Sequence, residues 1–262
     1  MKTGSIIIHV PHASMRVPDD VRDQFTISDS ELQSELNRLT DHFTDKLFCC
    51  SNLKSNTLVY PVSRFVVDPE RFVDDASEPM VAMGHGVIYT HSTSGKPIRR
   101  ALNDDDRTDL IQRFYEPHHQ ALTNLTASAL GAQGQAVIID AHSFPDVPLP
   151  MDLSQIQPRP DICLGTDPFH TPKNLISFVA AVFEQAGYSV AIDEPYSGTL
   201  VPLTYYQKNT SVVSLMIEIN RKLYMDIDEN TVIRSDGYDR INETIDEAME
   251  AVRVWVELEG VG

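Results

Sequence analysis

Cysteine is scarce in this chain, which has three cysteines among its 262 residues. Cys49 and Cys50 are adjacent, Cys163 stands alone, and no two cysteines have the CxxC spacing. This pattern excludes a disulfide framework and a cysteine-bound zinc site. Because reduced, buried thiols are typical of the cytoplasm, we expect a cytoplasmic protein.

Positive charge is also scarce, since 21 lysines and arginines stand against 38 aspartates and glutamates, for a formal net charge of −17. Binding to nucleic-acid phosphates needs a basic stripe, and the sequence contains none, so we expect no nucleic-acid partner. An anionic small molecule would have to be held by a few local arginines against an unfavourable overall field.

Long hydrophobic runs are missing as well. The first apolar run, residues 6–8, is followed by histidine and is far too short for a signal peptide. No stretch approaches the roughly 20 apolar residues that span a bilayer. We therefore expect no membrane partner.

Strand and helix patterns alternate along the chain. Apolar segments typical of buried strands occupy residues 5–10, 56–68, 135–143, 161–166, 188–193 and 211–220. Amphipathic patterns typical of helices occupy residues 28–48, 107–131, 174–187 and 238–258. We expect Pro117 to kink the second helix and Gly131 to end it. The alternation predicts a single three-layer α/β/α domain over residues 1–262, with a mixed, mostly parallel central sheet.

Polar side chains stand at the ends of the predicted strands. His9 and His12 follow the first apolar run, and Asp140 and His142 come near the end of the third strand. A strand end holds a side chain more rigidly than a loop does, so α/β enzymes place ligands and catalytic groups there. Glu218 lies within an otherwise apolar strand, where an unpaired carboxylate is costly, so it needs a partner or a function.

Two histidines and carboxylates from separate strand ends can form a catalytic zinc site, which has three protein ligands and one open position. The sequence lacks HExxH, which excludes a zincin helix. From the residues alone, a metallohydrolase is one interpretation, and hydrogen-bonded structural histidines at strand ends are the other.

A series of short motifs resembles one known family. The motifs are "HVPHAS", "TDHFTDKLF", "YPVSRFVVDPERF", "GVIYTHS", "YEPHHQAL", "VIIDAHSFP", "DICLGT", "DEPYSGTLVP" and "IEINRKLYMD". In this order, from near residue 6 to near residue 226, they resemble the N-formylglutamate amidohydrolase family. The resemblance implies a fold similar to zinc carboxypeptidases. It also implies zinc-dependent hydrolysis of an N-acyl amino acid, with N-formyl-L-glutamate giving formate and L-glutamate.

The same resemblance implies roles for particular residues. His12, Asp41 and His142 correspond to the zinc ligands, and Glu218 corresponds to the general base that takes a proton from the attacking water. Asp140 points the same way along its strand as His142, so it could orient a ligand imidazole. Ser143 follows in the same motif and is expected beside the ligands.

Asp41 poses a difficulty. On a continuous helix over residues 28–48 it lies opposite the apolar stripe, on the face expected to meet solvent. It can reach a metal only if that face borders the cleft or if the helix breaks near Thr40. Asp45, one turn further on, is the reserve candidate for the carboxylate ligand.

Three arginines are candidates for binding a substrate carboxylate, because a guanidinium can donate two parallel hydrogen bonds to it. They are Arg71, Arg64 and Arg221, and the alternative for each is a structural ion pair. Gly198 would let the backbone approach the ligand.

Two positions depart from the family pattern. Glu70 stands where an asparagine is usual, and an acid there is unfavourable for a substrate with two carboxylates. Thr199 stands where a second glycine is common. These departures leave open a carboxypeptidase-like or peptidoglycan-type amidase on the same scaffold. A non-catalytic small-molecule binding protein is the alternative from another class, but it would have no physical reason to keep His12, His142 and Glu218 together.

Overall fold

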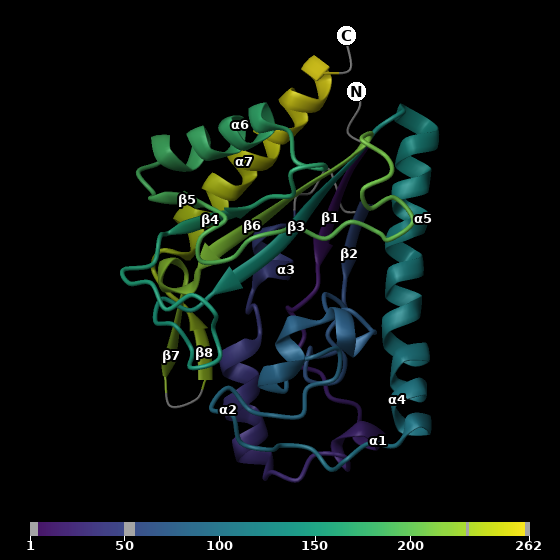
Figure 1. Ribbon diagram of the computed structural model, residues 1–262. Coiled ribbons are helices and arrows are strands. Elements are labelled where there is room, and N and C mark those ends of the chain that lie inside the picture. The colour runs from purple at the N-terminus through teal and green to yellow at the C-terminus, as the bar shows by residue number, and fades with distance from the viewer. Residues whose placement is uncertain (1–4, 50–55, 229–230, 260–262) are drawn as a thin grey trace.

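The computed structural model describes residues 5–49, 56–228 and 231–259, and its centre is a six-stranded sheet (Figure 1). The strand order is β2-β1-β3-β6-β4-β5. Every neighbouring pair is parallel except β4 and β6, which run antiparallel. The strands are β1 (Ile6–Val10), β2 (Thr57–Val59), β3 (Ala136–Phe144), β4 (Ile162–Gly165), β5 (Val190–Ile192) and β6 (Val212–Asn220). The prediction of a mixed, mostly parallel sheet is confirmed.

Helices cover both faces of this sheet. Helices α6 (Lys173–Gln185) and α7 (Tyr238–Glu259) lie on one face, and α5 (Glu116–Gln133) lies on the other (Figure 1). Alternation along β1 sends Ile6 and Ile8 to the α6/α7 side and Ile7 to the α5 side. The predicted α/β architecture therefore follows from strands that are apolar on both faces.

A third apolar cluster lies beyond the carboxyl ends of the central strands. It is built from α2 (Asp29–Leu39), the short helix α1 (Asp19–Arg22) and the long connections between residues 60 and 115. The remaining elements are α3 (Thr44–Leu47), η3 (Asp75–Ser77), η4 (Pro79–Met83), α4 (Asp104–Leu110), η5 (Ile111–Tyr115), η6 (Arg221–Leu223) and the hairpin of β7 (Met225–Asp228) and β8 (Thr231–Arg234). The expectation of a single domain stays a prediction.

The predicted helix over residues 28–48 is broken. A capping box of Ser28 and Glu31 starts α2, but Thr40 adopts an extended backbone and ends it. Phe43 then takes the left-handed region, with φ of 65°, before α3 begins. A side chain disfavours this conformation, so tertiary contacts rather than helix propensity set the path of residues 40–43.

Other boundaries also differ from the prediction. The second strand stops at Val59, before Pro61. A π-helical turn, η5, joins α4 to α5 just before Pro117, and Gly134, not Gly131, caps the C-terminus of α5. The β7–β8 hairpin was not predicted. None of the helices within the described ranges is both long and apolar enough to cross a membrane.

Gly165 is a position where only glycine fits. A Cβ atom there would lie 2.4 Å from the carbonyl oxygen of Gly198 and 2.2 Å from Cε of Met216. We expect Gly165→Ala to lower the free energy of unfolding by roughly 1–3 kcal/mol. Gly131→Ala is the control, because a Cβ there meets nothing within 4 Å and alanine favours the helix by roughly 0.5–1 kcal/mol. Urea unfolding measures the stability of each variant relative to the parent. A Gly165→Ala protein as stable as the parent would contradict the close approach.

Candidate metal and substrate site

Asp41 lies in the break between α2 and α3. Its backbone N–H donates to the carbonyl of His12 at 2.9 Å, which fixes the break against the end of β1. The side chain is 1% exposed, so the interpretation as a solvated acid is wrong. Of the two conditions for Asp41 to reach a metal, the break near Thr40 is the one that the structure meets. Asp45 instead pairs with Lys46 at 2.8 Å.

His12 and His142 face the Asp41 carboxylate through the same ring atom, Nδ1. Asp41 Oδ2 lies 3.2 Å from Nδ1 of His142 and 3.7 Å from Nδ1 of His12. Ligands of a tetrahedral zinc lie roughly 3.3 Å from one another, given bond lengths of about 2.0–2.1 Å. Asp41 Oδ2 therefore has about the ligand-to-ligand spacing of a metal site to each of the two histidines. Nδ1 of His12 is buried without a hydrogen-bond partner, which is the state of a nitrogen available to a metal.

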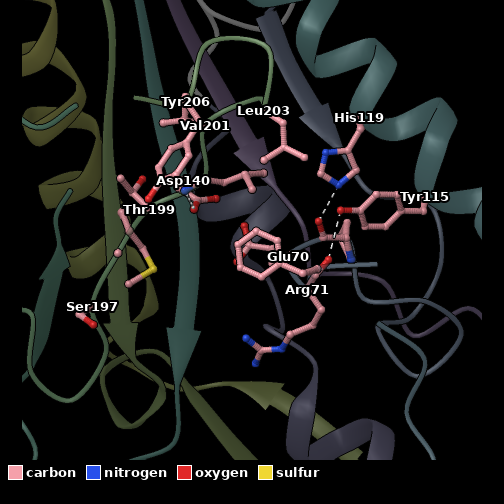
Figure 2. A pocket seen from close by; sticks show the side chains of 15 residues that line it. Glu70, Arg71, Tyr115, His119, Asp140, Ser197, Thr199, Val201, Leu203 and Tyr206 are labelled. Atoms are coloured by element: carbon pink, nitrogen blue, oxygen red, sulfur yellow. Dashed lines mark hydrogen bonds between the residues drawn. The ribbon is translucent and has the colours of Figure 1, made fainter. Parts of the chain in front are cut away.

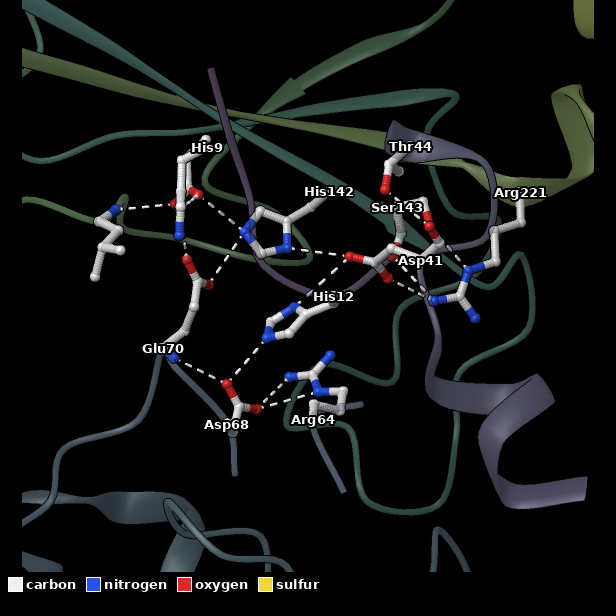
Figure 3. A network of polar contacts seen from close by, with 12 residues as sticks. His9, His12, Asp41, Thr44, Arg64, Asp68, Glu70, His142, Ser143 and Arg221 are labelled. Carbon is white, nitrogen blue, oxygen red and sulfur yellow. Dashed lines mark hydrogen bonds and ion pairs between the residues drawn. The ribbon is translucent and has the colours of Figure 1, made fainter. Parts of the chain in front are cut away.

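The second ring nitrogen of each histidine faces another carboxylate (Figure 3). Nε2 of His12 lies 2.9 Å from Asp68 Oδ1. Nε2 of His142 lies 3.1 Å from Glu70 Oε2 and 3.3 Å from Asp140 Oδ1. In His12, a carboxylate at the far nitrogen holds the imidazole in one tautomer and leaves the near nitrogen free for a metal. In His142, the near nitrogen Nδ1 is hydrogen-bonded to Asp41, and Nε2 has no hydrogen-bond partner. Asp140 lies beside the His142 ring, and its role in orienting that ring stays a prediction.

Asp68 and Glu70 were not predicted as members of the site. Asp68 ends the segment 56–68, so the signal that identified Asp140, an acid at the end of an apolar run, was present there too. Glu70 was noted only as a departure from a family pattern. Nothing in the sequence shows that its carboxylate turns towards His142.

Glu70 also provides alternative donor sets. Among the described residues, donor atoms of His12, Glu70 and His142 all lie within 4.8 Å of one another, and so do those of His9, Glu70 and Asp140. The second set is already joined by a hydrogen bond, since Nδ1 of His9 lies 2.8 Å from Asp140 Oδ1. Both sets share Glu70, so at most one of them could use it at a time.

The charges of this cluster balance in metal-free protein only through two protons. It contains five carboxylates and three guanidiniums, which are Asp41, Asp68, Glu70, Asp140, Glu218, Arg64, Arg71 and Arg221. Burial raises the pKa of Glu218 to about 8, which favours its neutral form. Burial opposes a charge on His142, but Glu70 and Asp140 outweigh it and hold the pKa of that imidazole well above its usual value. One divalent cation could take the place of these two protons, because metal binding to carboxylates and a neutral imidazole releases protons.

Cationic neighbours keep the buried aspartates ionised. Burial alone would raise the pKa of Asp68, but Arg64 and His12 outweigh it and hold that pKa well below its usual value. Burial likewise opposes ionisation of Asp41, whose pKa is held low by the nearby imidazoles of His12 and His142 and by the charge of Arg221. Ionised carboxylates are the form that binds metal.

The three candidate arginines differ in what they contact. Arg221 donates to Asp41 Oδ1 at 2.8 Å and to Ser143 Oγ at 3.0 Å, so it holds the Asp41 carboxylate in place. Arg64 donates to Asp68 Oδ2 through Nε at 3.1 Å and Nη2 at 2.8 Å. Arg71 lies 3.8 Å from the same oxygen, and its Nε has no hydrogen-bond partner. Arg71 is therefore the guanidinium best able to receive a substrate carboxylate.

Glu218 is the neighbour of His142 across the β3–β6 pair. Its side chain is buried, and Oε2 has no hydrogen-bond partner. Burial raises the pKa of Glu218 to about 8, and nearby Asp41 and Glu70 add to that rise, against the lowering by His142 and Arg221. A carboxyl group whose pKa lies near neutrality suits proton transfer.

Two cavities meet at Glu70. The larger, of about 400 Å³, has His12, Asp41, His142 and Glu218 in its wall. The smaller, of about 290 Å³, is also lined by Glu70 (Figure 2). Its walls include Tyr115, His119, Asp140, Gly198, Thr199, Leu203 and Tyr206. Gly198, with φ of 88°, therefore borders the smaller cavity and not the one containing the two ligand histidines.

A hydrogen-bonded chain supports Asp140 from behind. His118 of α5 contacts His9 through the two Nε2 atoms at 2.8 Å, and His9 contacts Asp140. Burial and the neighbouring His9 lower the pKa of His118 to about 2, so His118 is neutral. The backbone N–H of Leu200 donates to the other oxygen of Asp140 at 3.0 Å. His9 and His118 thus support one oxygen of Asp140 through this chain.

The raised pKa of Glu218 has a consequence for stability. In metal-free protein the folded state binds this proton more tightly than the unfolded state, whose glutamate has a pKa near 4.5. The stabilisation is complete below pH 4.5 and is lost as the pH rises towards about 8. Glutamine has no proton to lose, so Glu218→Gln should become progressively more stable than the parent across this window, by at most about 1.4 kcal/mol per pH unit. Urea unfolding with chelator at several pH values measures this, and parallel pH curves would show that Glu218 is not buried as described.

The chain is similar to proteins of one known family. The family model described as N-formylglutamate amidohydrolase matches residues 4–225 of the chain. The N-formylglutamate deformylase of Pseudomonas putida is 24% identical over 264 residues, which cover 95% of this chain and 92% of the relative.

Solved structures share the fold. The crystal structure of N-formylglutamate amidohydrolase from Ralstonia eutropha JMP134 matches with a TM-score of 0.84 at 23% identity, over 97% of this chain and 95% of that one. A gene product of Agrobacterium tumefaciens matches with a TM-score of 0.63 at 17% identity, over 97% of this chain and 94% of that one.

Proposed function

The chain belongs to the N-formylglutamate amidohydrolase family, and we propose that it is a zinc-dependent hydrolase of N-acyl amino acids, with N-formyl-L-glutamate as the reference substrate. The products would be formate and L-glutamate. The observation that carries this proposal is that Asp41 Oδ2 lies within 3.7 Å of Nδ1 of both His12 and His142 in the wall of one cavity.

His12, Asp41 and His142 are the proposed ligands, in preference to the set in which Glu70 replaces Asp41. Asp41 faces the Nδ1 atoms, which leaves Asp68 and Asp140 at the Nε2 atoms. If Glu70 were the ligand at Nε2 of His142, Nδ1 of that ring would face only Asp41. Zinc suits this donor set of two imidazoles and one carboxylate. When bound, it would polarise the amide carbonyl, favour ionisation of water near neutral pH and lower the pKa of the adjacent Glu218.

The protein groups then divide the remaining work. Glu218 accepts a proton from the attacking water and delivers it to the nitrogen of the leaving amino acid. Arg71 binds the α-carboxylate, which places the amide over the ligands. Arg64 borders the same cavity and remains hydrogen-bonded to Asp68. Arg221 holds Asp41, which makes it a structural partner of the site and not a substrate contact.

Metal content tests the ligand assignment. The isolated protein should carry about one zinc per chain. His142→Ala and Asp41→Asn should each lose the metal together with activity, whereas Glu218→Gln should keep the metal and lose at least about 10²-fold in kcat. Elemental analysis and kinetics on the same preparations measure both quantities. Full activity of the parent protein in the presence of chelator, without zinc, would refute the proposal, and normal turnover by Glu218→Gln would remove Glu218 as the base.

Arg71 should contribute to binding more than to chemistry. If it holds the α-carboxylate equally in the ground and transition states, Arg71→Met raises KM and leaves kcat nearly unchanged. Loss of charge-assisted hydrogen bonds corresponds to roughly 10- to 150-fold in kcat/KM. Arg71→Lys should restore substrate binding only partly, because lysine keeps the charge but lacks the planar guanidinium that donates two parallel hydrogen bonds. The penalty should shrink for an N-formyl amino-acid amide, and an equal penalty on acid and amide would show that Arg71 does not bind the α-carboxylate.

A further inference from the structure

We propose that Glu70 makes this site selective for N-acyl amino acids with a single carboxylate and a hydrogen-bond-donating side chain, such as an amide or an ammonium group, over those with an acidic side chain. This inference rests on the function proposed above and concerns the same cavity. It follows from the partners of each charged group in that cavity.

The cavity offers little positive charge to a second substrate carboxylate. Of the two guanidiniums in its wall, Arg64 already donates twice to Asp68. Arg71 keeps its Nε without a partner and is 25% exposed at its side chain. Within the described residues, one largely uncommitted guanidinium therefore borders the cavity. It can pair with one carboxylate, and the α-carboxylate common to all N-acyl amino acids would take it.

Most acids in the same wall already have partners. Asp41 pairs with Arg221, and Asp152 pairs with Arg159 at 2.7 Å. Glu78 accepts backbone N–H groups at both carboxylate oxygens, at 2.9 and 3.1 Å. These acids are compensated and have little need of a donor from the substrate.

Glu70 is different. Its Oε1 is buried without a hydrogen-bond partner, and the nearest ring nitrogen, Nδ1 of His9, lies 3.6 Å away and faces Asp140. Its Oε2 lies 3.1 Å from Nε2 of His142. The side chain is 16% exposed, at the point where the two cavities meet. An acceptor of this kind gains from a donor and is penalised by another anion.

Glu70 and Arg71 are consecutive and both line the cavity, and each has a buried side-chain atom without a hydrogen-bond partner. The matching ligand has a carboxylate for Arg71 and an N–H donor for Glu70. A second carboxylate on the ligand would be repelled by the charge of Glu70. Among the described residues, no second uncommitted guanidinium lines the cavity to offset this repulsion. N-formyl-L-glutamine and N-formyl-L-glutamate have nearly the same shape and differ in this feature alone.

The experiment compares kcat/KM for these two substrates in three zinc-loaded proteins: the parent, Glu70→Gln and Glu70→Asp. The parent should favour the glutamine substrate by about 10-fold or more, as expected for a charge-assisted hydrogen bond. Glu70→Gln should shift the ratio towards the glutamate substrate by a similar factor. Glu70→Asp keeps the charge and should keep the preference. Any general effect of Glu70 on His142 acts on both substrates and cancels in the ratio.

Hydrolysis of both substrates with the same ratio in the parent and in Glu70→Gln would overturn this inference and leave the proposed function standing. A parent protein that favours the glutamate substrate would overturn it as well. If the zinc-loaded parent hydrolyses neither substrate, the proposed function fails and this inference fails with it.

Discussion

The ion pair between Asp41 and Arg221 is the interaction on which the site depends. Arg221 directly follows β6, Asp41 lies in the break after α2, and the same guanidinium bonds to Ser143 near the end of β3. One side chain thus joins three segments that are distant in sequence. The pair leaves one Asp41 oxygen directed at the two histidines, and it holds the chain out of the helical path that residues 28–48 would otherwise follow.

The sequence predicted much of this architecture because local patterns determine it. Apolar runs identified the strands, and acids or imidazoles at their ends identified His12, Asp140 and His142. The break at Thr40 was only one of two possibilities, since the residues around it favour a helix. The contacts that override this preference come from Arg221 and from the backbone of His12, about 180 and 30 residues away along the chain. No local pattern contains that information.

The roles of the arginines and of Glu70 could not be read from the sequence for a related reason. Whether an arginine is free for substrate depends on which acids lie beside it in the fold. Arg64 is committed to Asp68, four residues on, whereas Arg71 is not, although both stand in the same loop. Likewise, the motif around Glu70 shows an acid next to an arginine. Only the packing of that loop against β3 shows that the acid reaches His142.

The cluster is costly to the fold while it lacks a metal. Five carboxylates lie among side chains that are largely removed from water, and protons on Glu218 and His142 must balance the charge that the three arginines leave. A cation that binds only the folded chain removes this cost and stabilises the protein by mass action. Folding and catalysis therefore depend on the same carboxylates. Loss of activity after a substitution here can be assigned to chemistry only when metal content and stability are measured on the same protein.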